Sequence, residues 1–500
     1  MRDLKRFVII GDMHLPERED AVQYDTFLWA MEEIKKINPD GVIVAGDITA
    51  TGEKNAIDFF KEKFASIDAP KVVLLGNSDV RTEENREYVS RVKQGDGFYA
   101  DGREIICINT PDGVIEESDK MRMEKSSFGA ILVMHHGIFA LDTESREFLI
   151  NWARKNKAAL ILQAHTHKMQ YSCISSTEII GLGTLDPEKA IGTPPCISVL
   201  ETDGDHIFVN HRFMELPTEK ILDFDDFLGI SCHDTEKDID YAIENNIKNI
   251  ELRKYDVSDT TIKFLADKIS QWRKSGGKVL SLHMPDLWYK DGEFSGMDKW
   301  NDASDLAITL GADSLTVHVP RVLVKDFKDS RDKFLDMYVD MIKKMPEKTA
   351  IAIENLHAKA TEKDDENRGF GYTPCEVIDW VDAINERFGY KRAGHNLDVG
   401  HARNNPPFRS KYTLGMWYSM LGERIEAYHI HQVRDTGKGS PNHKAIRDWY
   451  GELINYFAFF MAWGKNQLNH KPAFLEMRLL EDCDITLKSW KEFKKKQNWN

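Results

Sequence analysis

Short runs of apolar, largely β-branched residues recur along the first part of the chain and alternate with amphipathic stretches. Runs of this length, bounded by glycine or polar residues, are typical of buried strands. The amphipathic stretch 21–37 has the apolar spacing of a helix. Strands are predicted at 7–10, 41–45, 71–75, 130–134 and 160–164, and later strands near 178–183, 195–201 and 206–211 are predicted to form a second sheet that closes the domain.

Each of these early runs ends in side chains that bind metal ions. Asp12 and His14 follow the first run, and residues i and i+2 of an extended segment point to the same side. A carboxylate oxygen paired with an imidazole nitrogen suits Mn, Fe or Zn better than Mg or Ca. The carboxyl ends of parallel strands are where open α/β sheets bind ligands. The later runs end in Asp47, in Asn77 and Asp79, in His135 and His136, and in His165 and His167.

Beyond residue 222 the pattern becomes a regular alternation of strand and helix. Eight such units over ~280 residues predict a (β/α)8 TIM barrel, whose active site lies at the carboxyl ends of the strands. Strands are predicted at 226–231, 249–253, 278–283, 313–319, 349–354, 394–398, 425–431 and 473–476. Examples of the helices between them are predicted at 258–274, 330–345, 376–388 and 443–461.

The barrel strands also end in acids and imidazoles. A single buried histidine is usually a hydrogen-bonded core residue. Six successive strands that end in this way instead predict a metal site. The residues are His283, His318, Glu354, Asp398 with His401, His429 and His431 followed by His443, and Glu476.

The bulk properties indicate the kind of protein. The 500 residues suit two domains, predicted at 1–217 and 222–500 with a short linker at 216–220. The six cysteines form no CxxC pair, which fits a reducing compartment, and no apolar run approaches the ~18 residues of a membrane span. We therefore expect a cytoplasmic protein without membrane contact. The net charge of −15 argues against broad, non-specific nucleic-acid binding, although a local basic cleft in the second part remains compatible with it.

The order of motifs in the first part, D-x-H, G-D, G-N-x-D, H and H-x-H, resembles the calcineurin-like metallophosphoesterases. The resemblance implies an α/β sandwich with two ions of Mn, Fe or Zn. It assigns Asp12, His14 and His167 to one ion and Asn77, His135 and His165 to the other, with Asp47 bridging them. His136 is the alternative to His135 as a ligand.

One position departs from that family. Its usual G-N-H-D motif is Gly76-Asn77-Ser78-Asp79 here. The family histidine helps to protonate the leaving group, and serine cannot do so at neutral pH. Asp79 and His136 are the candidates for this role, and the alternative is a domain that holds metal but turns over poor leaving groups slowly.

The second part resembles the xylose isomerase-like barrels, which include sugar isomerases, epimerases and endonuclease IV. Glu354, Asp398, a histidine of the seventh strand and Glu476 are shared by the one-metal members. Three further histidines, His283, His318 and His443, resemble the extra ligands of the three-zinc endonuclease IV site. The implied site holds one to three Zn or Mn ions, with the ligands His283, His318, Glu354, Asp398, His401, His429, His443 and Glu476.

Two points in this ligand set stay open. Pro441 stands where endonuclease IV places an Asp ligand, so a water or His431 would substitute. His429 is preferred to His431 for its spacing to His443. The number of ions in the barrel therefore depends on residues that depart from the pattern.

The expected protein is a metal-dependent hydrolase that cleaves phosphate esters of nucleic acid or nucleotides. Asp47, Asn77 and Glu354 would contribute to catalysis beside Asp79 or His136. Aromatic and arginine residues in the loops 284–300, 355–373 and 402–411 could meet bases and phosphates. One alternative is a sugar (phosphate) isomerase or epimerase barrel fused to a small-molecule phosphatase. Another is an effector subunit of a larger assembly with an ATPase partner.

Overall fold

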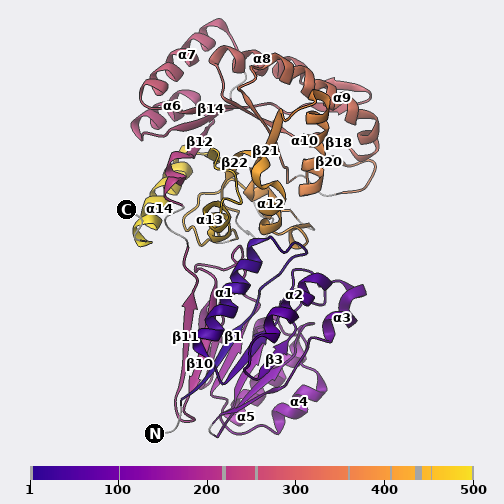
Figure 1. The fold of residues 1–500 in the computed structure, drawn as a ribbon, viewed down its shortest axis with the longest axis vertical. Helices are drawn as coiled ribbons and strands as arrows, with labels where there is room; N and C mark the ends of the chain where they lie inside the picture. Colours follow the sequence, from indigo (N-terminus) through magenta and orange to yellow (C-terminus); the bar gives the residue numbers. More distant parts are fainter. Residues whose placement is uncertain are drawn as a thin grey trace. The chain divides into compact units, whose positions relative to one another are not determined.

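The computed structural model divides into two compact units. One comprises Met1–Leu216 with Asn455–Phe459, and the other Pro217–Ile454 with Phe460–Asn500 (Figure 1). The structure describes residues 4–100, 102–216, 221–253, 257–357, 361–405, 408–433, 442–451 and 453–497. Residues 217–220 of the predicted linker, and Pro441, lie outside these ranges.

The first unit is built on two sheets. The order of the first is β11-β10-β1-β2-β3, and that of the second is β4-β5-β6-β7-β9-β8. The first sheet contains β1 (Lys5–Ile10), β2 (Gly41–Ala45), β3 (Lys71–Leu74), β10 (Cys196–Thr202) and β11 (Ile207–Phe213). The second contains β4 (Gly97–Ala100), β5 (Arg103–Ile108), β6 (Ile131–Met134), β7 (Leu160–Gln163), β8 (Gln170–Ile174) and β9 (Thr177–Gly181).

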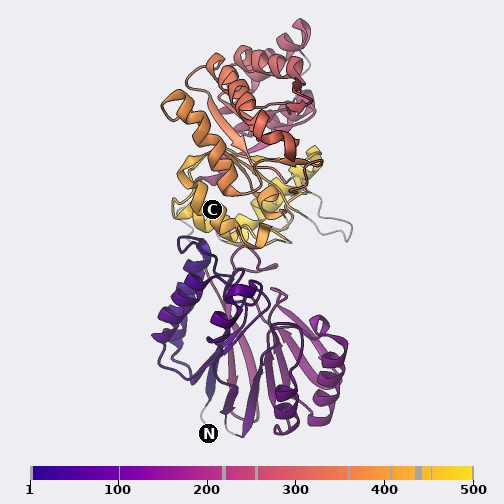
Figure 2. The ribbon, with the colours of Figure 1, turned by 90° about the vertical axis from the view of Figure 1, so that its right-hand side faces the viewer.

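The two sheets share an apolar core. Phe7, Ile43 and Leu74 of the first sheet belong to one buried cluster with Ile105 and Val133 of the second. Helices lie on the outer sides of the sheets (Figure 2). They are α1 (Val22–Ile37), α2 (Lys54–Ala65), α3 (Arg86–Ser90), α4 (Glu117–Glu124) and α5 (Thr143–Asn156). This arrangement confirms the predicted α/β sandwich.

The predicted arrangement of the late strands is wrong. β9 pairs in parallel with β7 and extends the second sheet. β10 pairs antiparallel with β1, and β11 pairs antiparallel with β10, so these two strands extend the first sheet instead of joining β9 in one. The sequence pattern missed β4, β5 and β8, which complete the second sheet. β8 is an edge strand with mostly exposed residues, so it lacks the apolar run that indicates a buried strand.

The second unit is a closed barrel of eight strands, each paired in parallel with its neighbours. All eight lie where the sequence predicted them. They are β12 (Leu228–Cys232), β13 (Asn249–Leu252), β14 (Val279–His283), β17 (Ser314–His318), β19 (Ala350–Glu354), β21 (Ala393–Asp398), β22 (Ile425–Ile430) and β23 (Ala473–Leu475). The helices are α6 (Thr235–Glu244), α7 (Asp259–Lys274), α8 (Met297–Leu310), α9 (Val324–Lys344), α10 (Pro374–Phe388), α11 (Val399–Arg403), α12 (Leu414–Leu421) and α14 (Leu480–Lys496). A further helix, α13 (Phe457–Gly464), begins in the segment Asn455–Phe459 of the first unit and ends in the second.

Two features of the barrel were not predicted. The helix expected at 443–461 is wrong, because the described residues between 442 and 456 are non-helical and α13 begins at Phe457. A small sheet of order β16-β15-β18-β20 is formed by segments that follow β14, β17 and β19. Its strands are β15 (Trp288–Lys290), β16 (Glu293–Ser295), β18 (Arg321–Leu323) and β20 (Asn367–Gly369).

Among the described residues, no helix is long and apolar enough to cross a membrane.

Candidate metal centres

The turns that end the strands of the first unit have an unusual backbone. Asp12, His14, Asp47, His165 and His167 have φ values of 49°, 47°, 52°, 67° and 54°. Left-handed conformations are uncommon for residues other than glycine, and they cluster at functional sites, where the surrounding structure maintains them. All five residues are candidate ligands from the sequence.

Two glycines allow the strand ends to approach closely. A Cβ on Gly46 would lie 2.7 Å from Nδ1 of His135, and one on Gly76 would lie 2.6 Å from Cε1 of the same ring and press into Oδ1 of Asp47. Gly46 also has a φ of +93°, which favours glycine. Any side chain at these positions would displace Asp47 or His135.

The first candidate centre brings together Asp12, His14, Asp47 and His167. Nε2 of His14 lies 3.1 Å from Nε2 of His167 and 3.6 Å from Oδ2 of Asp47. Nε2 of His167 lies 3.6 Å from Oδ1 of Asp12. Burial lowers the pKa of His14, and it lowers the pKa of His167 to about 3, so both rings are neutral at pH 7, as a metal ligand must be.

The second candidate centre lies beside the first. Nδ1 of His135 is 2.9 Å from the carbonyl oxygen of Ala45, which can only accept, so Nδ1–H donates to it and Nε2 is the nitrogen that could bind an ion. That Nε2 faces Oδ1 of Asn77 at 3.3 Å and Oδ1 of Asp47 at 3.5 Å, which are also acceptors. Facing acceptors fit a cation between them.

The sequence left His135 and His136 as alternatives, and the structure places both near His165. The three imidazoles form one group of potential ligands. Burial, with the nearby His135, lowers the pKa of His136 to about 4. Nδ1 of His136 is buried and has no hydrogen-bond partner among the described residues.

Ser78 and Asp79 are tied to the neighbouring loops by hydrogen bonds, and the Ser78 hydroxyl also contacts Asp47. Ser78 Oγ donates to the carbonyl oxygen of Thr49 at 2.6 Å, while its backbone N–H donates to Asp47 at 2.8 Å. The buried Asp79 carboxylate accepts from the backbone N–H groups of Thr49 at 2.8 Å and Gly76 at 2.9 Å. Burial, with the nearby Asp47, raises the pKa of Asp79 to about 7, but its contacts fix the loops. We therefore revise the candidate role of Asp79 in leaving-group protonation to a structural one, which leaves His136.

Three groups of potential ligands overlap among the described residues of the barrel. Adjacent groups share Glu354 or His401. The groups are His283, Glu354, His429 and Glu476; Glu354, Asp398 and His401; and His401, His431 and His443. These three groups contain the other sequence-predicted ligands of the barrel, and Nε2 of His318 lies 3.3 Å from Oε2 of Glu354.

Glu354 lies at the middle of this arrangement. Its Oε2 is 3.2 Å from Nε2 of His283, and its Oε1 is 3.3 Å from Nδ1 of His429 and 3.5 Å from Nδ1 of His401. Oε2 of Glu476 lies 3.1 Å from the same Nδ1 of His429. The carboxylates thus converge on imidazole nitrogens.

Several side-chain atoms of these candidate ligands are buried and have no hydrogen-bond partner within the described part of the chain, which is costly unless a ligand compensates. They include Oε1 of Glu354, Nε2 of His401, Nδ1 of His429 and Oε2 of Glu476. Burial lowers the pKa of His429, but the charges of Glu476, Glu251 and Glu354 outweigh it and raise that pKa well above its usual value. Divalent cations bound between these carboxylates would supply the positive charge that a protonated His429 otherwise provides. The residues therefore fit a metal site.

Both histidines of the seventh strand belong to candidate ligand groups. His429 faces Glu354 and Glu476, whereas Nε2 of His431 lies 3.1 Å from Oδ1 of Asp398. The sequence preferred His429 to His431 as a ligand. The structure makes both candidates, because residues i and i+2 of a strand point to the same side, here into the barrel.

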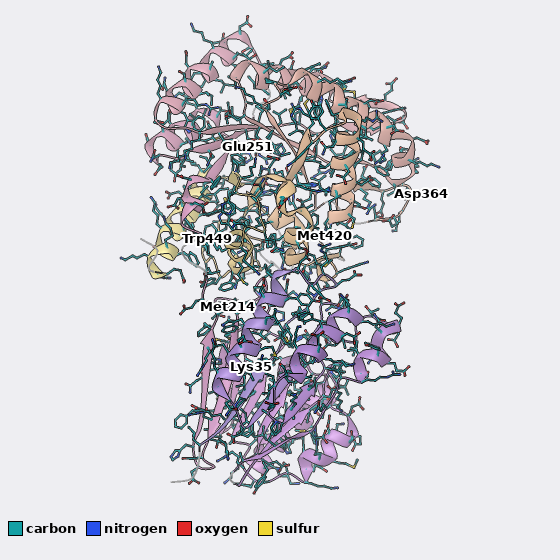
Figure 3. All side chains as sticks on the ribbon, viewed as in Figure 1. Lys35, Met214, Glu251, Asp364, Met420 and Trp449 are labelled. Atoms are coloured by element: carbon teal, nitrogen blue, oxygen red, sulfur yellow. The ribbon has the colours of Figure 1, made fainter. Side chains whose placement is uncertain are left out.

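Three residues that contact candidate ligands were missed in the sequence. Buried Glu251, at the end of β13 and labelled in Figure 3, holds Nε2 of His429 at 3.0 Å. Asp286 accepts a hydrogen bond from Nδ1 of His318, and Arg253 forms an ion pair with Glu476. A carboxylate within the apolar run Asn249-Ile-Glu-Leu252 was the available signal for Glu251.

The fold and these centres define two kinds of domain in one chain. A model of the calcineurin-like phosphoesterase family matches residues 5–169, and a model of the xylose isomerase-like TIM barrel family matches residues 240–478. The chain thus contains a metallophosphoesterase domain followed by a TIM barrel domain.

Among known proteins, a probable cyclic nucleotide phosphodiesterase of Xenorhabdus bovienii is 24% identical over 193 residues, covering 32% of this chain and 78% of the relative. Endonuclease IV of Thermus thermophilus is 14% identical, covering 54% of this chain and 99% of its own, with a TM-score of 0.36. D-allulose 3-epimerase of Methylomonas sp. is 13% identical, covering 54% of this chain and 96% of its own, with a TM-score of 0.37.

Proposed function

We propose that this protein is a two-domain phosphoesterase that hydrolyses phosphate esters of nucleotides or nucleic acid, with a dinuclear centre in the first domain and a trinuclear centre in the barrel. The observation that carries the proposal is the number of ligands in the barrel. The three overlapping groups contain eight different side chains, and a single divalent ion takes only about four to six ligands. A site for several ions suits phosphoester hydrolysis, in which ions bind both the attacking and the leaving oxygen.

In the first domain, the chain's own residues would hold and orient the reacting groups. One ion would be bound by Asp12, His14 and His167, and the other by Asn77, His135 and His165. Asp47 would bind both ions. Bound ions would activate a water molecule and offset charge on the phosphoryl oxygens. His136, next to the second group, is the remaining candidate for proton transfer to the leaving group. The phosphodiesterase activity in the name of the Xenorhabdus bovienii protein supports a nucleotide diester as substrate.

In the barrel, Glu354 would hold two ions, because its two oxygens face different histidines. Its Oε2 faces His283 and His318, and its Oε1 faces His429 and His401. Asp398, His431 and His443 would complete the site.

A second candidate is a sugar epimerase barrel. The feature that favours it is the pair Glu354 and Glu476, whose carboxylates lie 3.3 Å and 3.1 Å from the same nitrogen of His429. Two carboxylates around one ion suit proton transfer at a sugar carbon. This candidate requires one ion in the barrel.

Metal analysis of the full chain separates the candidates. The dual phosphoesterase predicts five ions per chain, two and three, whereas the epimerase predicts three. Asp47→Asn and Glu354→Gln should each abolish a different phosphoesterase activity, tested on a cyclic nucleotide and on an oligonucleotide. A barrel with one ion, or hydrolysis that Glu354→Gln leaves unchanged, would refute the trinuclear hydrolase.

A further inference from the structure

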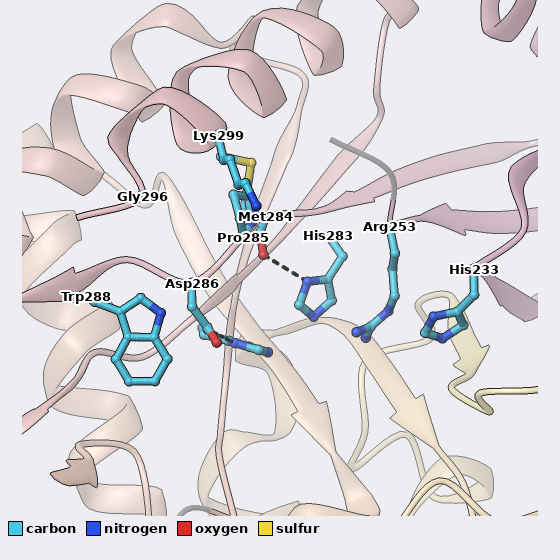
Figure 4. A pocket seen from close by; sticks show the side chains of 10 residues that line it. His233, Arg253, His283, Met284, Pro285, Asp286, Trp288, Gly296 and Lys299 are labelled. Atoms are coloured by element: carbon cyan, nitrogen blue, oxygen red, sulfur yellow. Dashed lines mark hydrogen bonds and ion pairs between the residues drawn. The ribbon is translucent and has the colours of Figure 1, made fainter. Parts of the chain in front are cut away.

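A cavity opens beside two of the barrel's candidate ligands, His283 and His318. Its volume is about 580 Å³, within the range of about 300–1,000 Å³ that small-ligand sites occupy. Figure 4 shows Trp288 on one side of His283 and Arg253 with His233 on the other. The remaining lining residues are Met284, Pro285, Asp286, Gly296 and Lys299.

Trp288 lies on β15 of the small sheet and lines this cavity. β15 pairs with β16 and with β18, and its successive side chains alternate between the two faces of the small sheet. Tyr289 is buried against Phe294 and Phe334, with ring centroids 5.3 Å and 6.2 Å away. Trp288 therefore points to the opposite face, where it lines the cavity and stays 42% exposed. An exposed indole on this strand is a surface on which a planar group can stack.

Cationic and hydrogen-bonding groups approach the same cavity from other elements. Arg253 follows β13 and is fixed by its ion pair with Glu476. Lys299 lies in the first turn of α8 and is exposed, and His233 follows β12. The cavity thus combines an aromatic surface, a cation at its rim and the metal ligands at its inner end.

We propose that this cavity binds one nucleotide unit of the barrel's substrate. The base would stack on Trp288, the reacting phosphate would lie toward His283 and His318, and Lys299 would meet a second phosphate or the ribose. The net charge of −15 opposes extended contact with a duplex backbone, so a mononucleotide or a strand end is favoured. This inference rests on the proposed phosphoesterase function and specifies its substrate.

Binding measurements on the full, metal-loaded chain test the proposal. AMP and ribose 5-phosphate carry the same phosphate and sugar, but only AMP carries a base. By calorimetry, Trp288→Ala should weaken AMP binding about 5- to 100-fold and change ribose 5-phosphate binding less than about twofold. Trp288→Phe should restore most of the AMP affinity. Tyr390→Ala, which removes another exposed aromatic ring, serves as the matched control and should change neither.

Two results would overturn the proposal: AMP affinity unchanged in Trp288→Ala, or an equal loss for ribose 5-phosphate, which would make the cavity a sugar-phosphate site. Hydrolysis is measured separately. AMP binding that depends on Trp288, together with no barrel phosphoesterase activity under any metal, would support the cavity and refute the proposed function. Nucleotide hydrolysis by the barrel with an unaffected Trp288→Ala variant would refute only the cavity.

Discussion

Glu251 offers the sharpest test of how the barrel prepares its metal ligands. The buried carboxylate accepts four hydrogen bonds inside the barrel. His429 Nε2, at 3.0 Å, and Ser231, at 3.3 Å, donate to Oε1, while Thr316, at 2.7 Å, and Ser281, at 3.3 Å, donate to Oε2. When an ion is bound, Nε2–H of His429 would donate to Glu251, so Nδ1, which faces Glu354 and Glu476, would offer its lone pair to that ion.

The variant Glu251→Gln keeps the shape of the side chain and removes its charge. The serine and threonine hydroxyls can rotate to suit an amide, but His429 then donates to an uncharged oxygen or loses its acceptor. Removing such an outer partner costs about 10- to 100-fold in metal affinity. This corresponds to about 1.4–2.8 kcal/mol.

The assay is metal binding by the full chain in buffers of set free Zn²⁺, with the metal content measured at each point. Glu236→Gln, which changes an exposed glutamate on α6, is the matched control. Nitrogen NMR of the histidine rings should also show His429 losing its preference for Nε2–H. If the affinity stays within about twofold and the metal-free protein unfolds normally, Glu251 does not orient His429 and the reasoning is refuted.

Three further changes test other parts of the structure. Ser78→Ala should cost about 1 kcal/mol of stability by losing the bond to Thr49 and change kcat by less than about threefold; a loss of 100-fold would assign Ser78 to catalysis. Gly76→Ala should lower the metal content of the first domain, since the new Cβ meets Asp47 and His135, and unchanged metal content would contradict this. Burial lowers the pKa of His395 to about 3, so the unfolded chain takes up a proton there that the folded chain refuses. Stability should fall by up to about 1.4 kcal/mol per pH unit from about pH 6.5 down toward 3, and His395→Leu should remove that part of the slope seen in denaturant unfolding; equal slopes would contradict it.

The sequence predicted the barrel better than it predicted the first domain. Barrel strands are buried on both faces, so all eight have apolar runs, and six of these runs end at ligand-type residues such as His283 and Glu354. In the first domain, β8 is exposed at a sheet edge and leaves no such run. Pairing partners of β9 and β10 depend on contacts between distant residues, which local periodicity cannot specify.

The candidate sites, too, could be predicted only where no contact between distant residues was needed. Strand-end positions and motif order predicted which residues gather, since parallel strands end at one edge. They did not predict contacts made across the barrel, such as Glu251 with His429 or Arg253 with Glu476. Nor did they reveal that Asp79 accepts hydrogen bonds from backbone amides.

The central position of Glu354 has a consequence for how the barrel fills. Its two oxygens face two different sets of histidines, so an ion bound to one oxygen fixes the carboxylate for the next. Each ion would also relieve the repulsion among buried acids that the following ion meets. We expect loading to be cooperative, with empty and full barrels in equilibrium over a narrow range of free metal and few partly filled ones between them.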